Sequence, residues 1–76
     1  MIDYKRALDI ARDQWDEIDY FQEQDKAFIF SKKDDRSFGG NGPVVVLKDT
    51  GECLNMPAYI CEGLSSPTIN EGYIKD

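Results

Sequence analysis

Apolar residues near the start of the chain recur at helical spacing. Successive members of this stripe lie four, three, four and three residues apart, and they are Tyr4, Leu8, Ala11, Trp15 and Ile18. Residues at that spacing share one face of an α-helix. We therefore predict an amphipathic helix over about residues 3–18, with Asp3 as its N-cap, because an aspartate can accept a hydrogen bond from a first-turn amide. Such a helix is not stable alone, so we expect its stripe to pack on a sheet.

Beyond the helix the apolar pattern changes to that of β-strands. We predict strands over about residues 20–23, 27–31, 43–48 and 52–55. In the second strand, Phe28 and Phe30 share the face that is expected to meet the helix. The third strand has an unbroken apolar run at 44–47, which indicates a strand that is central or covered on both faces. Asp-Thr-Gly at 49–51 predicts the turn that brings the chain back antiparallel.

The signals weaken after Met56 and Pro57, which read as a helix stop. The segment 60–76 fits a short strand, a helical turn or disorder. The chain is predicted to be one α+β domain, in which an N-terminal amphipathic helix packs on a small antiparallel sheet of three to four strands. The leading core candidates are Leu8, Ala11, Trp15, Phe28, Phe30, Val44 and Val46.

The composition restricts the function. Nine basic and fifteen acidic side chains give a net charge of −6, which repels nucleic acid. The chain has no histidine, and 76 residues bury too little core for a deep reaction chamber. We therefore expect no enzyme activity, no cofactor and no bound metal. No apolar run reaches the roughly 18 residues of a membrane span, and the N-terminus lacks a secretory signal, so we expect no membrane partner and a cytoplasmic location.

The two cysteines and the glycine cluster at 39–42 are of types that occur in functional sites, but here their spacing and context favour a structural role. Cys53 and Cys61 are eight residues apart, which fits neither a redox pair nor a zinc site, so we expect two buried, reduced thiols. Gly-Gly-Asn-Gly at 39–42 leads into a proline and a strand, whereas phosphate-binding loops lead into a helix. A tight chain reversal is the preferred interpretation of that glycine cluster.

One stretch of the chain resembles a known family. Residues 40–52 read G-N-G-P-V-V-V-L-K-D-T-G-E, after a short helix that ends near a tryptophan and two aromatic strands. This order is similar to that of the small bacterial YrhB-like proteins, the immunity protein 35 family, with its G-N-x-P, apolar strand and D-K-x-[ST]-G-E hairpin. The likeness covers about residues 39–54. The chain departs from the family pattern at Leu47, where an aspartate is usual, and after Pro57, where the family has an amphipathic helix.

The resemblance implies a non-enzymatic immunity protein, encoded beside a bacterial toxin, that binds and neutralises this toxin in the cytoplasm. An acidic domain suits a basic toxin surface, because complementary charge speeds association. The candidate partner-binding residues are the helix acids Asp9, Asp13, Asp16 and Glu17, with Tyr59 as a possible anchor. Such acids also serve solubility alone, and Tyr59 is as readily a core residue.

Two other classes of function remain open from the residues. The third strand and its hairpin partner could present a free edge, which would make the chain a small structural protein that oligomerises through its sheet. An enzyme that uses Cys53 or Cys61 would need a lowered thiol pKa, and the nearby sequence offers mostly acids. We favour the toxin-binding hypothesis over both.

Overall fold

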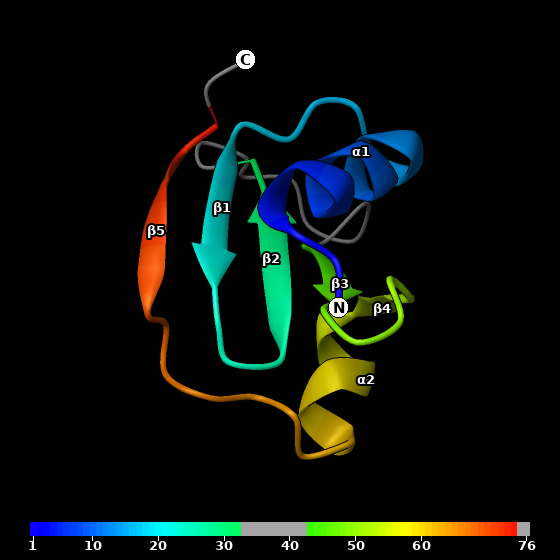
Figure 1. The fold of residues 1–76 in the computed structure, drawn as a ribbon, viewed down its shortest axis with the longest axis vertical. Coiled ribbons are helices and arrows are strands. Elements are labelled where there is room, and N and C mark those ends of the chain that lie inside the picture. Colours follow the sequence, from blue (N-terminus) through cyan, green and yellow to red (C-terminus); the bar gives the residue numbers. More distant parts are fainter. Residues whose placement is uncertain (33–42, 75–76) are drawn as a thin grey trace.

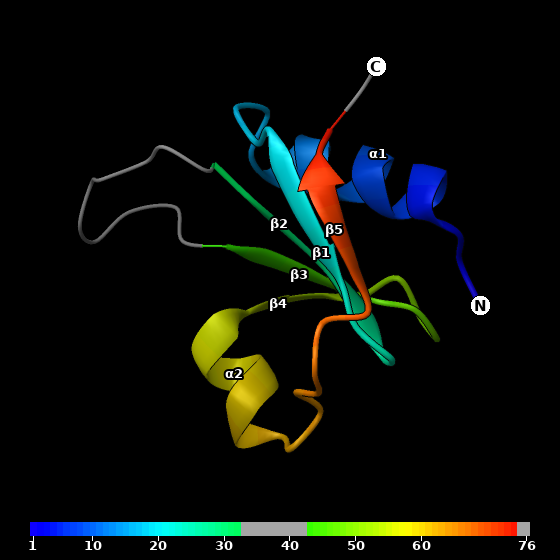
Figure 2. The ribbon, with the colours of Figure 1, turned by 90° about the vertical axis from the view of Figure 1, so that its left-hand side faces the viewer.

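The computed structural model describes residues 1–32 and 43–74, and its strands form one antiparallel sheet with a helix on each face (Figures 1 and 2). The sheet order is β4-β3-β2-β1-β5. The predicted α+β class is confirmed, with five strands in place of three to four. The elements are α1 (Tyr4–Gln14), β1 (Tyr20–Glu23), β2 (Ala27–Ser31), β3 (Val44–Leu47), β4 (Cys53–Asn55), α2 (Met56–Cys61) and β5 (Asn70–Tyr73).

Helix α1 begins as expected and ends four residues early. The Oδ1 atom of Asp3 accepts a hydrogen bond of 2.9 Å from the amide of Arg6, as an N-cap does. The helix stops at Gln14 because Trp15 adopts an extended backbone, with φ −154° and ψ 101°. Trp15 and Ile18 are nevertheless buried. The apolar stripe therefore identifies the buried side chains correctly, although its last two members reach the core from outside the helix.

The main core lies between α1 and the sheet. Seven of its eight buried residues come from α1, the segment after it and β2. The buried members are Ala7, Leu8, Ala11, Trp15, Ile18, Phe28, Phe30 and Val46. Six of the seven predicted core residues are among them. The seventh, Val44, is only partly buried, because it lies at the start of β3 and packs against the outside of this cluster.

A second, smaller core lies on the opposite face of the sheet, under α2. Its buried members are Ala27, Ile29, Val45 and Tyr59. Val45 and Val46 point to opposite faces of β3, and both are fully buried. The unbroken apolar run of this strand therefore reflects cover on both sides, as predicted.

The C-terminal part of the chain forms α2 and the fifth strand. Asn55 caps α2 by accepting a 2.8 Å hydrogen bond from the amide of Ala58. Pro57 lies in the first turn, where proline needs no intrahelical partner, so it begins this helix and does not stop one. Gly63, at φ +70°, turns the chain after the helix. The segment then crosses to the other edge of the sheet, where β5 pairs with β1.

Of the two strands that the oligomerisation hypothesis placed at a free edge, the hairpin partner β4 is an edge strand and β3 is not. β3 is bonded on both sides, to β2 and to β4, so it is not an edge strand. In the described part of the chain the edges are β4 and β5. No helix of that part is both long enough and apolar enough to span a bilayer. The glycine cluster at 39–42 lies outside the described residues.

Candidate functional site

The four predicted acids are all exposed, but they do not share a helix face. Asp9 and Asp13 lie one turn apart on α1, so their carboxylates are neighbours. Asp16 and Glu17 lie in the turn that follows, because the helix ends before them. The predicted continuous acidic helix face is therefore wrong in its geometry. The four residues instead line the last two turns of α1 and the connection to β1, and we call them the acidic surface.

The acidic surface has a strong local charge. Residues 9–19 hold five carboxylates and one arginine. The basic residues Lys5 and Arg6 are exposed one turn earlier on the same helix, so the negative potential is concentrated toward the C-terminal half of α1. A surface of this kind can attract cationic side chains of a partner and orient its approach.

Tyr59 lies in the smaller core and not at a rim. Its side chain is 0% exposed, and its hydroxyl donates a 2.7 Å hydrogen bond to Oε1 of the buried Gln24. The same Oε1 accepts a 3.1 Å hydrogen bond from the amide of Ser66. Burial and, to a lesser degree, the charge of Asp25 raise the pKa of the Tyr59 phenol above its ordinary value. A side chain so enclosed offers no surface to a partner, so the predicted anchor is corrected to a core residue.

A groove that the sequence did not predict runs beside the free edge strand β5. Its volume is about 560 Å³, and it is mainly apolar; it is lined by Tyr4, Phe21, Glu23, Asn70, Glu71, Gly72 and Tyr73. Helix α1 packs over β3 and β2, which leaves the β1–β5 half of the same face without a helix above it (Figure 1). We call this hollow the β5 groove.

Aromatic contacts shape the β5 groove. The ring of Tyr4, in the first turn of α1, meets the ring of Phe21 edge to face at 4.9 Å between centroids. Phe21 faces Gly72 across the β1–β5 pair, and the missing side chain of Gly72 leaves the groove open above the Phe21 ring. On the other face of the same two strands, Tyr20 and Tyr73 contact edge to face at 5.2 Å. These contacts fix β5 on the sheet and leave its outer edge uncovered.

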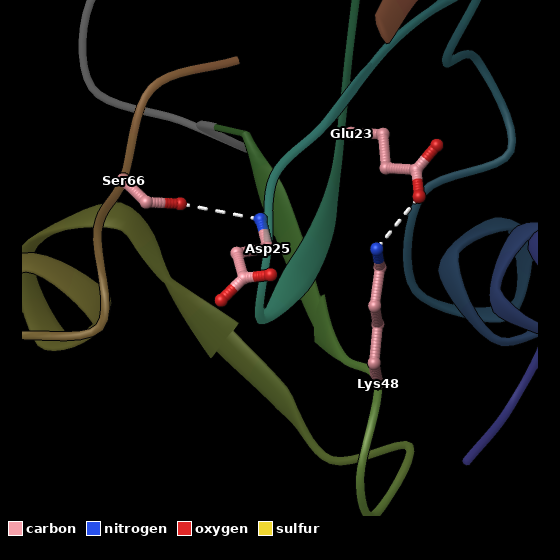
Figure 3. A network of polar contacts seen from close by, with 4 residues as sticks. All are labelled: Glu23, Asp25, Lys48 and Ser66. Carbon is pink, nitrogen blue, oxygen red and sulfur yellow. Dashed lines mark hydrogen bonds and ion pairs between the residues drawn. The ribbon is translucent and has the colours of Figure 1, made fainter. Parts of the chain in front are cut away.

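One residue of the groove lining, Glu23, is held in an ion pair (Figure 3). The Nζ atom of Lys48 lies 2.6 Å from Oε2 of Glu23, and Lys48 is buried. The same Nζ lies 4.9 Å from the centroid of the Phe28 ring, within the range of a cation–π contact. Nearby, Ser66 Oγ accepts a 3.2 Å hydrogen bond from the amide of Asp25, which ties the β1–β2 turn to the segment before β5. Each of these two contacts joins segments that are distant in the sequence: Glu23 of β1 to Lys48, and the β1–β2 turn to Ser66.

The two cysteines differ in exposure, and neither is fully buried as the sequence predicts. Cys53 is partly buried in β4, and burial, followed by the charges of Asp13 and Glu52, raises the pKa of its thiol. Cys61 is exposed. It follows Tyr59 by two residues in α2, and therefore points about 200° away from the side that packs on the sheet. The raised thiol pKa of Cys53 is the opposite of what a nucleophile requires.

We expect iodoacetamide to modify Cys61 several times faster than Cys53 at neutral pH, because alkylation needs an accessible thiolate. Mass spectrometry of the native protein at timed intervals measures both rates. Under denaturing conditions the two rates should become similar. Faster labelling of Cys53 in the native state would contradict the geometry described here.

The described residues contain no group of three or more metal-ligating side chains close enough to hold an ion. The β5 groove was not predictable from local patterns, because its walls come from distant parts of the chain: Gly72, which faces Phe21, follows it by 51 residues. The one available signal was the pair of apolar residues, Tyr73 and Ile74, in the C-terminal segment.

Comparison with known proteins adds no relative to this picture. No protein-family model, no curated protein and no solved structure matches the chain. The likeness to the immunity protein 35 family therefore stays a prediction that is based on residues 39–54 alone.

Proposed function

We propose that this chain is a non-enzymatic immunity protein that binds a cognate bacterial toxin in the cytoplasm and neutralises it. The observation that carries the proposal is the exposure of all four carboxylates of the acidic surface, on one continuous segment from α1 into the turn after it. The family resemblance of residues 39–54 supports the same role.

The physical basis of the proposed binding is charge complementarity. Carboxylates concentrated within eleven residues create a local potential that attracts a basic protein surface and orients it before contact. Such steering raises association rates and weakens as salt is added. The proposal therefore requires a toxin with a basic surface and an association rate that falls with ionic strength.

The test uses the C-terminal module of a large secreted protein encoded beside this chain. Co-expression of the chain should restore growth of cells that produce this module, and surface plasmon resonance should show direct binding. Replacing Asp9, Asp13 and Asp16 with Asn and Glu17 with Gln should reduce the association rate about tenfold or more at low salt. The variant should fold normally, since none of the four side chains is buried.

A matched variant separates the position of the charges from their number. Asp25, Asp49, Glu62 and Glu71 are also exposed, and neutralising them removes the same four charges from other parts of the surface. The association rate of this control should change little. Equal effects of the two variants would show that only net charge matters. The absence of any toxin gene beside this one, or no growth rescue by the unaltered chain, would refute the immunity role.

A further inference from the structure

Within residues 1–32 and 43–74, the outer edge of β5 presents backbone groups that have no hydrogen-bond partner, in a known register. The amide of Ile74 donates a 2.8 Å hydrogen bond to the carbonyl of Asp19, the residue before β1. In an antiparallel ladder the backbone groups of alternate residues face the same neighbour. Those of Gly72 and Ile74 therefore face β1, whereas the N–H and C=O groups of Glu71 and Tyr73 point away from the sheet.

Few of the features that usually protect an edge strand are found on β5. Natural edges are blunted by lysine, proline or a bulge, and the four residues of β5 contain none of these. The edge is also apolar at both ends, since Ile69 is 65% exposed and Tyr73 is 57% exposed. The other edge strand, β4, has only three residues and runs directly into α2. The accessible template for strand addition is therefore β5.

The two sides of this edge differ in chemistry. An added strand would place alternate side chains on the two faces of the sheet. On the α1 side, a side chain opposite Gly72 would enter the β5 groove, whose floor is aromatic. On the other side, side chains opposite Glu71 and Tyr73 would meet a carboxylate and an exposed aromatic ring. The position opposite Gly72 favours an apolar residue, and the positions opposite Glu71 and Tyr73 favour basic residues.

We propose that the edge of β5 and the adjoining β5 groove bind an extended protein segment of alternating basic and apolar residues, which adds antiparallel to β5 as a sixth strand. Charge complementarity selects this occupant: Glu71 is an exposed carboxylate on the face that the basic residues would meet, the groove lining contains no basic residue, and the chain carries a net charge of −6. A second copy would instead bring Glu71 and the same net charge to the contact. The site is distinct from the acidic surface, so this proposal does not depend on the immunity role.

The test measures binding of a fluorescein-labelled heptapeptide, Lys-Val-Lys-Val-Lys-Val-Lys, to the full 76-residue chain by fluorescence anisotropy. The alternating peptide should bind at least about fivefold more tightly than Lys-Lys-Val-Val-Val-Lys-Lys, which has the same composition and charge. N-methylation tests the register directly. Methyl groups on the lysine amides, which face β5, should weaken binding roughly fivefold to a hundredfold, and the same groups on the valine amides should have little effect.

A protein variant tests the groove. Gly72→Val should fill the space above Phe21, because an added Cβ would lie 3.6 Å from Cε1 of that ring, an ordinary contact that requires no displacement. This variant should keep its circular dichroism spectrum and bind the alternating peptide about fivefold or more weakly. As the matched control, Ser65→Val introduces a valine at an exposed position that is outside the groove lining.

Three outcomes would overturn the proposal. Equal binding of the two heptapeptides would show that binding depends on the net charge of the peptide and not on the alternation of its residues. Equal effects of the two N-methylated peptides would exclude strand addition at β5. A concentration-dependent dimer in sedimentation equilibrium that Gly72→Val abolishes would assign this edge to a second copy of the chain. The four-acid variant of the acidic surface should bind the heptapeptide about as well as the unaltered chain, which keeps this test separate from that of the immunity role.

Discussion

Replacement of Phe30 with alanine is expected to lower the free energy of unfolding by about 3–5 kcal/mol, the usual cost of truncating a buried phenylalanine. Phe30 is fully buried in β2, directly opposite Phe21 on one side and Val44 on the other. Its ring also contacts those of Tyr4 and Phe28. Removing it opens a cavity where α1 meets the sheet, and these aromatic neighbours cannot collapse into it without disturbing the strands.

The loss is large for a domain of this size. Small domains have total stabilities of about 5–15 kcal/mol, so the variant would keep little margin at 25 °C. Thermal unfolding followed by circular dichroism should show a midpoint lower by roughly 12–40 °C. Ile60→Ala is the control, because Ile60 is 56% exposed on α2 and its truncation should cost less than about 0.5 kcal/mol. A midpoint within a few degrees of the unaltered protein would show that Phe30 is not in the core.

Features of the fold that depend on residues close together in the sequence could be predicted, and features that depend on distant residues could not. The periodic stripe from Tyr4 to Ile18 and the alternation in Phe28 and Phe30 are local, and each of these side chains has the inward position expected of it. The end of α1 was missed because the stripe continues at helical spacing after the helix stops. Trp15 and Ile18 are apolar because their side chains are buried in the core. An extended segment after the helix places them there as well as a longer helix would.

The structure of the C-terminal half could not be predicted from local sequence, because it depends on contacts with distant parts of the chain. Residues 70–73 contain one large apolar side chain, and they form a strand only because β1 offers them a partner across almost fifty residues. The sequence predicts a helix stop at Pro57, and this prediction is wrong because proline also starts helices when a capping residue such as Asn55 precedes it.

The candidate sites, like the fold, have features that could be predicted from local sequence and features that could not. The exposure of the four acids could be predicted, since such side chains are rarely buried. Their arrangement could not, because Asp16 and Glu17 leave the helix when it ends at Gln14. The β5 groove requires knowledge that α1 covers only part of the sheet, and no local pattern contains that information.

Replacement of Tyr59 with alanine is expected to lower the free energy of unfolding by about 3–5 kcal/mol and to release α2 from the sheet. Tyr59 is the only buried residue of this six-residue helix, which is too short to persist alone. Tyr59→Phe keeps the ring and removes only the hydrogen bond to Gln24, so it should cost about 1–2 kcal/mol at neutral pH. Urea unfolding of the two variants beside the unaltered chain separates packing from hydrogen bonding. Equal costs for both would show that the ring contributes little.

The phenol of Tyr59 should also make the domain sensitive to alkaline pH. Its folded-state pKa is raised above 10.0, chiefly by burial and then by the charge of Asp25, so folding favours the protonated phenol. The stability linked to this proton is fully present below about pH 10 and is lost as the pH rises through the raised pKa. Tyr59→Phe, which cannot ionise, should lose less stability over that range, and its free energy of unfolding should approach that of the unaltered chain. Tyr73→Phe, at an exposed position, is the matched control and should follow the unaltered chain at every pH. If Tyr59→Phe also follows the unaltered chain through the alkaline range, then the alkaline loss comes from groups other than this buried phenol.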